Sequence, residues 1–345
     1  MSSSQHKASV RNIYGFAAIA SVLTLLLVFL KAGPSAVLPV LVLAVIEITF
    51  SFENAVINSQ VLSKFNKFWQ TVFLTLGIAI AVFGVRLILP LILVSGTSGH
   101  SMSQVISLAL HSPDQYASEL NSAYPLIAAF GGVFLLLIGL RFFGERREVR
   151  WLNTVEAPLA EFNQPWGVVI AGVFGAVAVI YFFLTPHSKA KALAGLMGGA
   201  AFLIIKLISS LLMRFGTNYQ KKTGKLDGKA ALAQFIYLEL LDASFSFDGV
   251  VAAFAVTKEV VLIAAGLGIG ALFVRSITLH LLRRGTLEHY RYLIHGAHYA
   301  ILSLAVVMLA GIKYHIPEFM TGLLGLVFIG AAIRSSIQHN QQQAV

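Results

Sequence analysis

Two stretches of this sequence repeat one pattern. Residues 47–54 read EITFSFEN, and residues 242–249 read DASFSFDG. The shared order is an acidic residue, any residue, a hydroxyl residue, Phe, Ser, Phe, a second acidic residue, and a small or amide residue. Both stretches lie within apolar segments, where an ionisable side chain costs on the order of 2.5–3.5 kcal/mol. Residues this costly indicate a functional site or a buried partner.

The composition places these stretches in a membrane protein. Of the 345 residues, 57% are hydrophobic and 12% are charged, whereas a soluble domain is about 25% charged. The mean hydropathy is +0.80, and segments of about 20 apolar residues suffice to cross a bilayer core of roughly 30 Å. The sequence therefore predicts one all-α transmembrane domain over residues 1–345, a polytopic bundle of about ten helices. The expected segments are 11–31, 35–62, 69–95, 124–143, 166–185, 191–213, 231–257, 259–282, 290–311 and 317–337.

The basic residues orient this bundle. With the N-terminus inside, seventeen Lys and Arg fall on the inner side and five on the outer side, and the other three lie within apolar segments. This asymmetry predicts a multi-pass protein with both termini cytoplasmic, and it explains the net charge of +10 without nucleic acid. Lys7 and Arg11 precede the first segment, which we interpret as a retained signal-anchor helix. Short loops favour a bacterial inner membrane.

The two segments that carry the motif have opposite predicted orientations in the membrane, so the motifs form an inverted repeat. By the same count, the first motif lies in a segment running from outside to inside, and the second lies in one running from inside to outside. Residues 77–86 also align with 266–275, so that Arg86 matches Arg275. We therefore expect one inverted repeat over 35–143 and another over 231–337. Such architectures place the substrate site near the bilayer midplane, where the repeats meet.

The acidic residues of both repeats suit a hard divalent cation. Because the chain has no Cys, a metal ion must be held by oxygen or imidazole, and Mn²⁺, Mg²⁺ and Ca²⁺ prefer carboxylate, carbonyl, hydroxyl and water oxygens. Protons compete with the ion for the same carboxylates, which favours proton-coupled antiport. The candidate metal ligands are Glu47, Ser51, Glu53, Asn54, Glu239, Asp242, Ser246 and Asp248.

Helix geometry leaves two arrangements of these acids open. At about 100° per residue, Glu53 lies roughly 120° around the helix from Glu47, and Asp248 has the same relation to Asp242. Either the helices unwind near Asn54 and near Gly249, or one acid of each pair binds an arginine. The natural buried counter-charges are Arg86 and Arg275.

The motifs resemble those of the TerC-like integral membrane proteins, a tellurium-resistance branch of the LysE-type transporter superfamily. The resemblance covers roughly residues 35–335 and rests on Glu53-Asn54 and Asp248-Gly249. Family members typically carry an Asp-Asn pair at the first position, so the Glu53 of this chain indicates a divergent branch. The resemblance implies export of a divalent metal, manganese above all, and a metal-site role for Glu53, Asn54 and Asp248.

Three functions remain open on the sequence alone. The first is a secondary transporter that exports a divalent cation, with Mn²⁺ and protons as its partners within the lipid membrane. The second is an exporter of another solute, Ca²⁺ or a basic amino acid, and the third is a non-transporting membrane assembly or stress factor. Since no Walker motif, nucleophile elbow or zinc-hydrolase spacing occurs, we expect neither an enzyme nor a resident cofactor. Whether the protein is a homo-oligomer is left open.

Overall fold

The computed structural model describes residues 10–161, 165–185, 187–214, 223–254, 256–314 and 316–343. Within these ranges the chain forms helices and no strand, which confirms the predicted all-α class. Seven helices are long and apolar enough to cross a membrane, and a bent helix pair adds an eighth span. The protein is therefore a multi-pass helical membrane protein.

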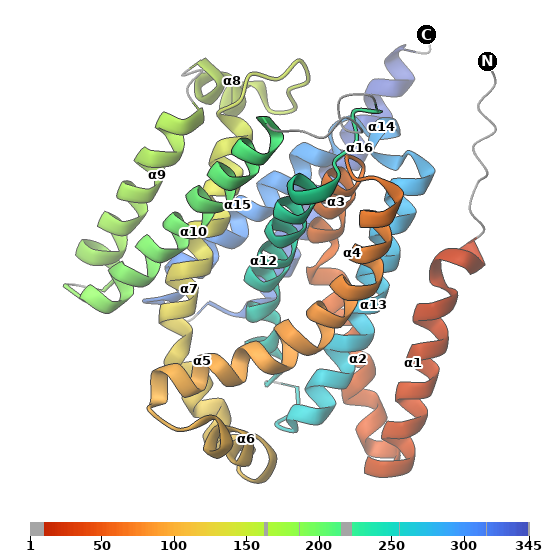
Figure 1. Ribbon diagram of the computed structural model, residues 1–345, viewed down its shortest axis with the longest axis vertical. Helices are drawn as coiled ribbons and strands as arrows, with labels where there is room; N and C mark the ends of the chain where they lie inside the picture. Colours follow the sequence, from red (N-terminus) through yellow and green to blue (C-terminus); the bar gives the residue numbers. More distant parts are fainter. Residues whose placement is uncertain are drawn as a thin grey trace.

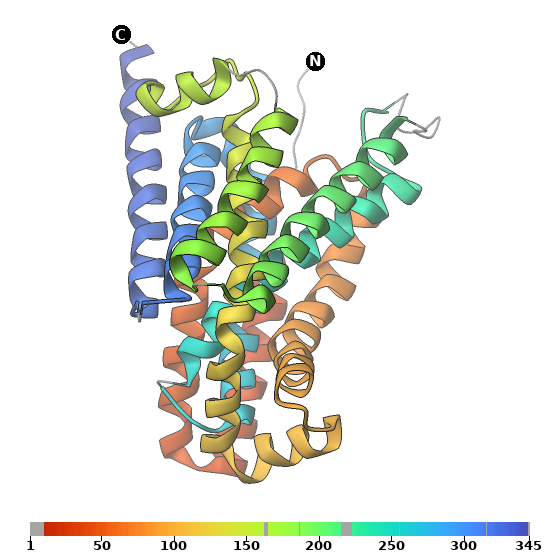
Figure 2. The ribbon, with the colours of Figure 1, turned by 90° about the vertical axis from the view of Figure 1, so that its left-hand side faces the viewer.

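Successive long segments run alternately down and up in Figure 1. Figure 2 shows the same alternation from the side. Each of the ten expected segments corresponds to a helix or to a run of adjoining helices. The bounds are α1 (Val10–Ala32), η1 (Pro34–Ala36), α2 (Val37–Phe50), α3 (Phe52–Leu62), α4 (Lys67–Ala79), η2 (Ile80–Ile88), α5 (Leu89–Ser98), α6 (Met102–His111), α7 (Pro113–Phe143), α8 (Asn153–Glu161), α9 (Pro165–Val179), η3 (Ile180–Leu184), α10 (Lys189–Arg214), α12 (Gly228–Ala253), α13 (Val260–Arg284), α14 (Thr286–His289), α15 (Leu293–Gly311) and α16 (Glu318–Gln343).

The first motif lies across a break between α2 and α3. The two helices meet at 53°, and Ser51 between them has non-helical backbone angles, φ −105° and ψ 17°. One of the two open arrangements requires unwinding near Asn54, and the break lies three residues earlier. The hydroxyl of Ser51 donates a hydrogen bond of 2.7 Å to the Glu47 carboxylate, so the side chain of the break residue is satisfied inside the protein. Backbone irregularity at membrane depth is tolerated where it is buried in this way.

The second motif lies within an unbroken helix, so the unwinding near Gly249 that one of the two open arrangements requires does not occur. Helix α12 continues through this glycine to Ala253. A Cβ atom on Gly249 would lie 3.3 Å from Oε2 of Glu47. The glycine therefore makes room for a carboxylate of the other repeat, and a chain break is not needed to explain it.

The third predicted segment is longer and less regular than expected. It runs through α4, the π-helical stretch η2 and α5, from Lys67 to Ser98. The residues between the third and fourth predicted segments, 96–123, include α6 and the first turns of α7. Ser101 and Gln104 form a capping box at the start of α6, and Pro113 occupies the first turn of α7. Both are ordinary helix-start signals.

The two repeats run in opposite directions. In Figure 1, α2 and α3 rise while α12 descends, and α4 descends while α13 rises. Helix α13 packs closely on α2 because two glycines one turn apart face it: a Cβ on Gly266 would lie 2.6 Å from Leu43, and one on Gly270 would overlap the side chain of Glu47. Small residues permit this approach between membrane helices. The helices that carry the two motifs therefore run antiparallel, and the inverted repeats over 35–143 and 231–337 stay a prediction.

The core lies between α3, α7, α10, α12 and α15. Its buried side chains include Phe73, Phe134, Phe202 and Leu241. Helices α1 and α9, by contrast, expose large apolar side chains such as Phe16 and Phe174. Because lipid tails solvate such surfaces, these helices form the periphery of the bundle.

Candidate functional site

Acidic residues of both repeats meet at the centre of the helix bundle. Glu47 on α2 and Asp242 on α12 are each 2% exposed, and Glu239 on α12 is 8% exposed. The two buried arginines of the sequence repeat lie beside them, Arg86 on η2 and Arg275 on α13. The five side chains form one charged cluster.

Arg86 joins the two repeats. Its Nη2 donates to Oε1 of Glu47, and its Nη1 lies 3.8 Å from Oδ2 of Asp242. Nη1 also donates a hydrogen bond of 2.7 Å to the carbonyl of Ala81, five residues back. That carbonyl belongs to the π-helical stretch, where widening of the helix frees backbone groups. The irregular backbone therefore helps to hold this guanidinium between Glu47 and Asp242.

Arg275 holds the other side of the cluster. Its Nη2 lies 3.4 Å from Oε1 of Glu239 and 3.5 Å from Oδ2 of Asp242. Its guanidinium carbon lies 3.9 Å from the centre of the Phe73 ring, a cation–π contact. Asp242 is thus shared by the arginines of both repeats. The arrangement in which acids bind arginine therefore holds for Glu47, Glu239 and Asp242.

Amide and hydroxyl groups surround these charges. Asn54 donates to Oδ1 of Asp242, and Ser246 lies one turn further along α12. Several buried polar atoms have no hydrogen-bond partner among the described residues, and an unsatisfied buried group costs about 1–3 kcal/mol. Around the cluster they are Oδ1 of Asn54, Oδ1 and Nδ2 of Asn58, Oδ2 of Asp242, Oγ of Ser246, Nε of Arg86 and Nη1 of Arg275. Such groups are ordinarily satisfied by water or an ion.

Asn58 is a polar residue that the sequence reasoning does not select. It is fully buried on α3, one turn beyond Asn54. The signal is present in the sequence, because Glu47, Ser51, Asn54 and Asn58 are spaced four, three and four residues apart. This spacing marks one face of a helix. The acidic motif shared by the two repeats ends at residue 54, so it does not include this continuation.

Glu53 differs from the other acids because no cation pairs with it. It is 5% exposed, and no Lys, Arg or His of the described ranges lies within 4.0 Å of its carboxylate. A cavity of about 20 Å³ lies against it, room for about one water molecule. The lining of this cavity comes from both repeats and from α16: Ile46, Glu47, Phe50, Ser51, Glu53, Phe245, Gly249, Leu304 and Gly322.

One acid of the predicted metal site has a side chain that the structure does not describe. Asp248 belongs to α12, but its side chain lies outside the described part of the structure. Among the side chains that are described, no three His, Asp or Glu residues converge closely enough to hold a metal ion by themselves. Any cation here would therefore take hydroxyl, amide or water oxygens as well as carboxylates.

Sequence comparison places the chain in a family. Residues 52–343 match the family described as "Protein of unknown function (DUF475)". The chain belongs to the DUF475 family. No curated protein matches this chain, and no solved structure matches it either.

In this DUF475 protein, the buried carboxylates at the acidic cluster outnumber the buried guanidiniums. Three carboxylates, Glu47, Glu239 and Asp242, contact the two guanidiniums of Arg86 and Arg275. A fourth, Glu53, lies with Glu47 in the lining of the small cavity. With these six described groups ionised, and Asp248 not counted, the formal charge is −2. Because a buried net charge is strongly unfavourable, the cluster attracts two protons or cationic charge of the same size.

Proposed function

We propose that this DUF475 protein is a secondary transporter that exports a divalent cation, Mn²⁺ first among the candidates, in exchange for protons. The observation that carries the proposal is the excess of two buried negative charges beside a cavity of about 20 Å³. One divalent ion or two protons would neutralise the same cluster. Exchange between these two states is the chemistry of an antiporter.

The cavity offers the oxygen ligands that hard cations prefer. Glu47 and Glu53 supply carboxylates, and Ser51 supplies a hydroxyl. The unpaired oxygens of Asn54 and Ser246 lie on the same two helices as the acids. The similarity of the motifs to those of the TerC-like proteins supports manganese as the ion.

The arrangement of the repeats supports alternating access. The break at Ser51 separates α2 from α3, and α12 runs opposite to both. In transporters built from inverted repeats, broken helices hold the substrate between the repeats, and one repeat rocks against the other. The seventeen inner basic residues support cytoplasmic termini, so that export runs from this side outward.

The cavity size bears on the alternative solutes. A space of about 20 Å³ is filled by one water-sized particle, whereas a basic amino acid contains many more heavy atoms. In this conformation the site therefore favours an ion over an amino acid. If the protein is a non-transporting assembly or stress factor, the acids carry no ion across the membrane. Transport measurements distinguish this alternative from an exporter.

Reconstitution tests the proposal. Purified protein is placed in liposomes containing a manganese-quenched dye, and Mn²⁺ entry is recorded with and without a pH gradient. We expect entry driven by the gradient for the wild type and none for Glu53→Gln. Glu259→Gln is the matched control, because Glu259 is exposed and lies outside the cluster. If the wild type moves no Mn²⁺ under any gradient, manganese transport is excluded.

A further inference from the structure

A second and much larger cavity lies apart from the acidic cluster. Its volume is about 430 Å³, and its walls come from α3, α7, α10, α12 and α15. Residues near the C-terminal ends of α3 and α7 line it, and these two helices end at the top of Figure 1. None of the acidic cluster residues lines it. This cavity therefore lies outside the proposed transport site.

The charges in this cavity are mainly positive. Lys64, Arg141, Arg147 and Lys206 line it, and Glu145 is the one carboxylate in its lining. With these groups ionised, the formal charge is +3. Glu145 is shared, because Arg147 Nη2 lies 2.8 Å from Oε2 and Arg141 Nη2 lies 3.3 Å from Oε1. A cation entering this space would be repelled, so the cavity suits an anion.

Among these basic residues, Lys206 gives the clearest indication of an anion site. No carboxylate of the described ranges lies within 4.0 Å of its Nζ. The ammonium lies instead 4.3 Å from the centre of the Tyr237 ring and 5.9 Å from that of Phe202. Two aromatic faces compensate only part of the cost of removing a charge from water. The ammonium therefore remains available to an anion.

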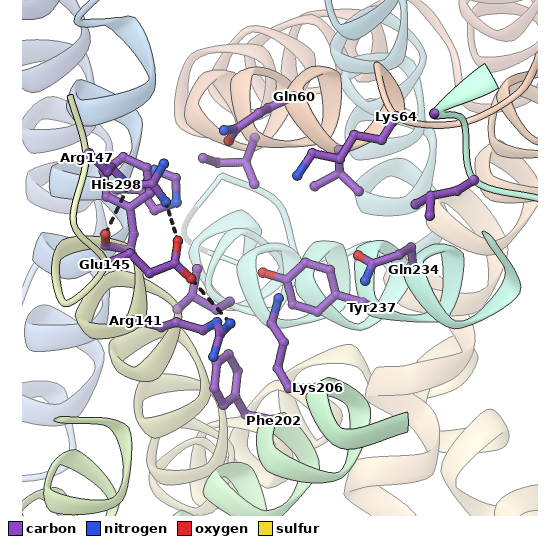
Figure 3. Close-up of a pocket in the computed structure, with 16 residues that line it drawn as sticks. Gln60, Lys64, Arg141, Glu145, Arg147, Phe202, Lys206, Gln234, Tyr237 and His298 are labelled. Carbon is purple, nitrogen blue, oxygen red and sulfur yellow. Dashed lines mark hydrogen bonds and ion pairs between the residues drawn. The ribbon is translucent and has the colours of Figure 1, made fainter. Parts of the chain in front are cut away.

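Further donors face the same space. Figure 3 shows the charged ends of Lys64, Lys206 and Arg141 directed toward a common space, with Gln60 at its edge. One guanidinium nitrogen of Arg141, Nη1, is buried and has no hydrogen-bond partner within the described residues. Arg and Lys together are typical of phosphate recognition, because guanidinium binds two oxygens while ammonium supplies a compact charge.

We propose that this cavity binds a phosphate-bearing anion, either the headgroup of an anionic phospholipid or a soluble phosphate compound. A formal charge of +3 exceeds what a single carboxylate would balance and suits a phosphate group. The volume lies within the range of small-molecule sites, about 300–1,000 Å³. Basic cavities between membrane helices are also known positions for lipid headgroups.

Thermal unfolding of the full chain in detergent tests this proposal and separates the two sources. One arm adds phosphatidic acid in mixed micelles, with phosphatidylcholine as the neutral comparison, and the other adds inorganic phosphate. The variants are Lys206→Met and Lys64→Gln. Lys67→Gln is the matched control, because this exposed lysine is near Lys64 in sequence but does not line the cavity.

We expect at least one anion to raise the Tm of the wild type and of Lys67→Gln by several degrees. Lys206→Met should have a higher Tm than the wild type without anion, because an unpaired and half-buried charge has been removed. Its Tm should rise little further when an anion is added. Lys64 is exposed at the edge of the cavity. Lys64→Gln should therefore leave the fold intact and weaken the apparent affinity for the anion about tenfold. The proposal is overturned if neither anion stabilises the wild type, or if both cavity variants respond as the wild type does.

Discussion

Nη1 of Arg86 lies 3.8 Å from Oδ2 of Asp242, so an arginine of the first repeat reaches an acid of the second. The same oxygen lies 3.5 Å from Nη2 of Arg275. Charge-assisted hydrogen bonds are usually about 2.7–2.9 Å, so these two contacts are loose. Loose ion pairs between the repeats suit a site where a cation or a proton must compete with arginine for one carboxylate.

Removing Arg86 should destabilise the protein strongly. Arg86→Met leaves Glu47 buried without its cation, and breaking a buried ion pair by removing one partner costs about 3–5 kcal/mol. We expect less folded protein on size-exclusion chromatography and a clearly lower Tm in detergent. Arg150→Met is the control, because Arg150 is exposed and forms no ion pair within the described residues.

Combining Arg86→Met with Glu47→Gln should recover part of the lost stability. The double variant removes both charges of the pair, so no uncompensated carboxylate remains at that position. A double-mutant cycle on Tm values measures the coupling. Simple additivity of the two single effects would contradict the ion pair between them.

Two neighbouring glutamates should respond differently to neutralisation. Glu47→Gln removes the partner of Arg86 and should lower both stability and transport. Glu53→Gln removes a buried carboxylate that has no described cationic partner, and it should abolish transport while leaving the Tm equal to or above that of the wild type. Parallel unfolding and flux measurements on both variants test this. A large loss of stability in Glu53→Gln would mean that its carboxylate has a structural partner.

Helix α16 should tolerate a methyl group at one glycine and not at another. A Cβ on Gly322 would overlap the ring of Phe50, which lines the small cavity. Overpacking of this kind costs about 1–3 kcal/mol, so Gly322→Ala should lower the Tm and reduce transport. A Cβ on Gly330 would meet no atom within 4 Å, and Gly330→Ala should match the wild type. Equal behaviour of the two variants would contradict the contact between α16 and Phe50.

Exchange of one divalent ion for two protons should be electroneutral. The formal charge of −2 at the cluster is balanced equally by either. Mn²⁺ flux into liposomes clamped with potassium and valinomycin should therefore follow the pH gradient and ignore the membrane potential. A flux that increases strongly with potential at constant pH would exclude this stoichiometry.

The sequence predicts the segments of this fold well and their irregularities poorly. Hydropathy and the positions of Lys and Arg locate all ten segments, because long apolar runs and charged ends are local properties. At the break, Ser51 donates to Glu47, and Glu47 in turn accepts from Arg86 of the π-helical turn, which also lies near Asp242. Those contacts depend on how the helices pack, which a linear pattern does not give.

For the candidate site too, the sequence predicts the residues, whereas their pairing depends on how the helices pack. The motif identifies Glu47, Asp242 and both arginines as residues in need of partners. It does not reveal that Asp242 is shared between Arg86 and Arg275, because that depends on how α12, α13 and η2 pack. Lys206 stands out in the sequence as a membrane-embedded charge, yet only the fold shows it beside a basic cavity.

Cellular manganese tests the central claim most directly. Cells expressing the wild type, Glu53→Gln, Glu259→Gln or no protein are loaded with manganese, and their metal content is measured by elemental analysis at matched membrane levels. We expect the wild type and Glu259→Gln to lower cellular manganese, and Glu53→Gln to match cells without the protein. Equal manganese in all four would contradict a manganese-exporting site at the acidic cluster.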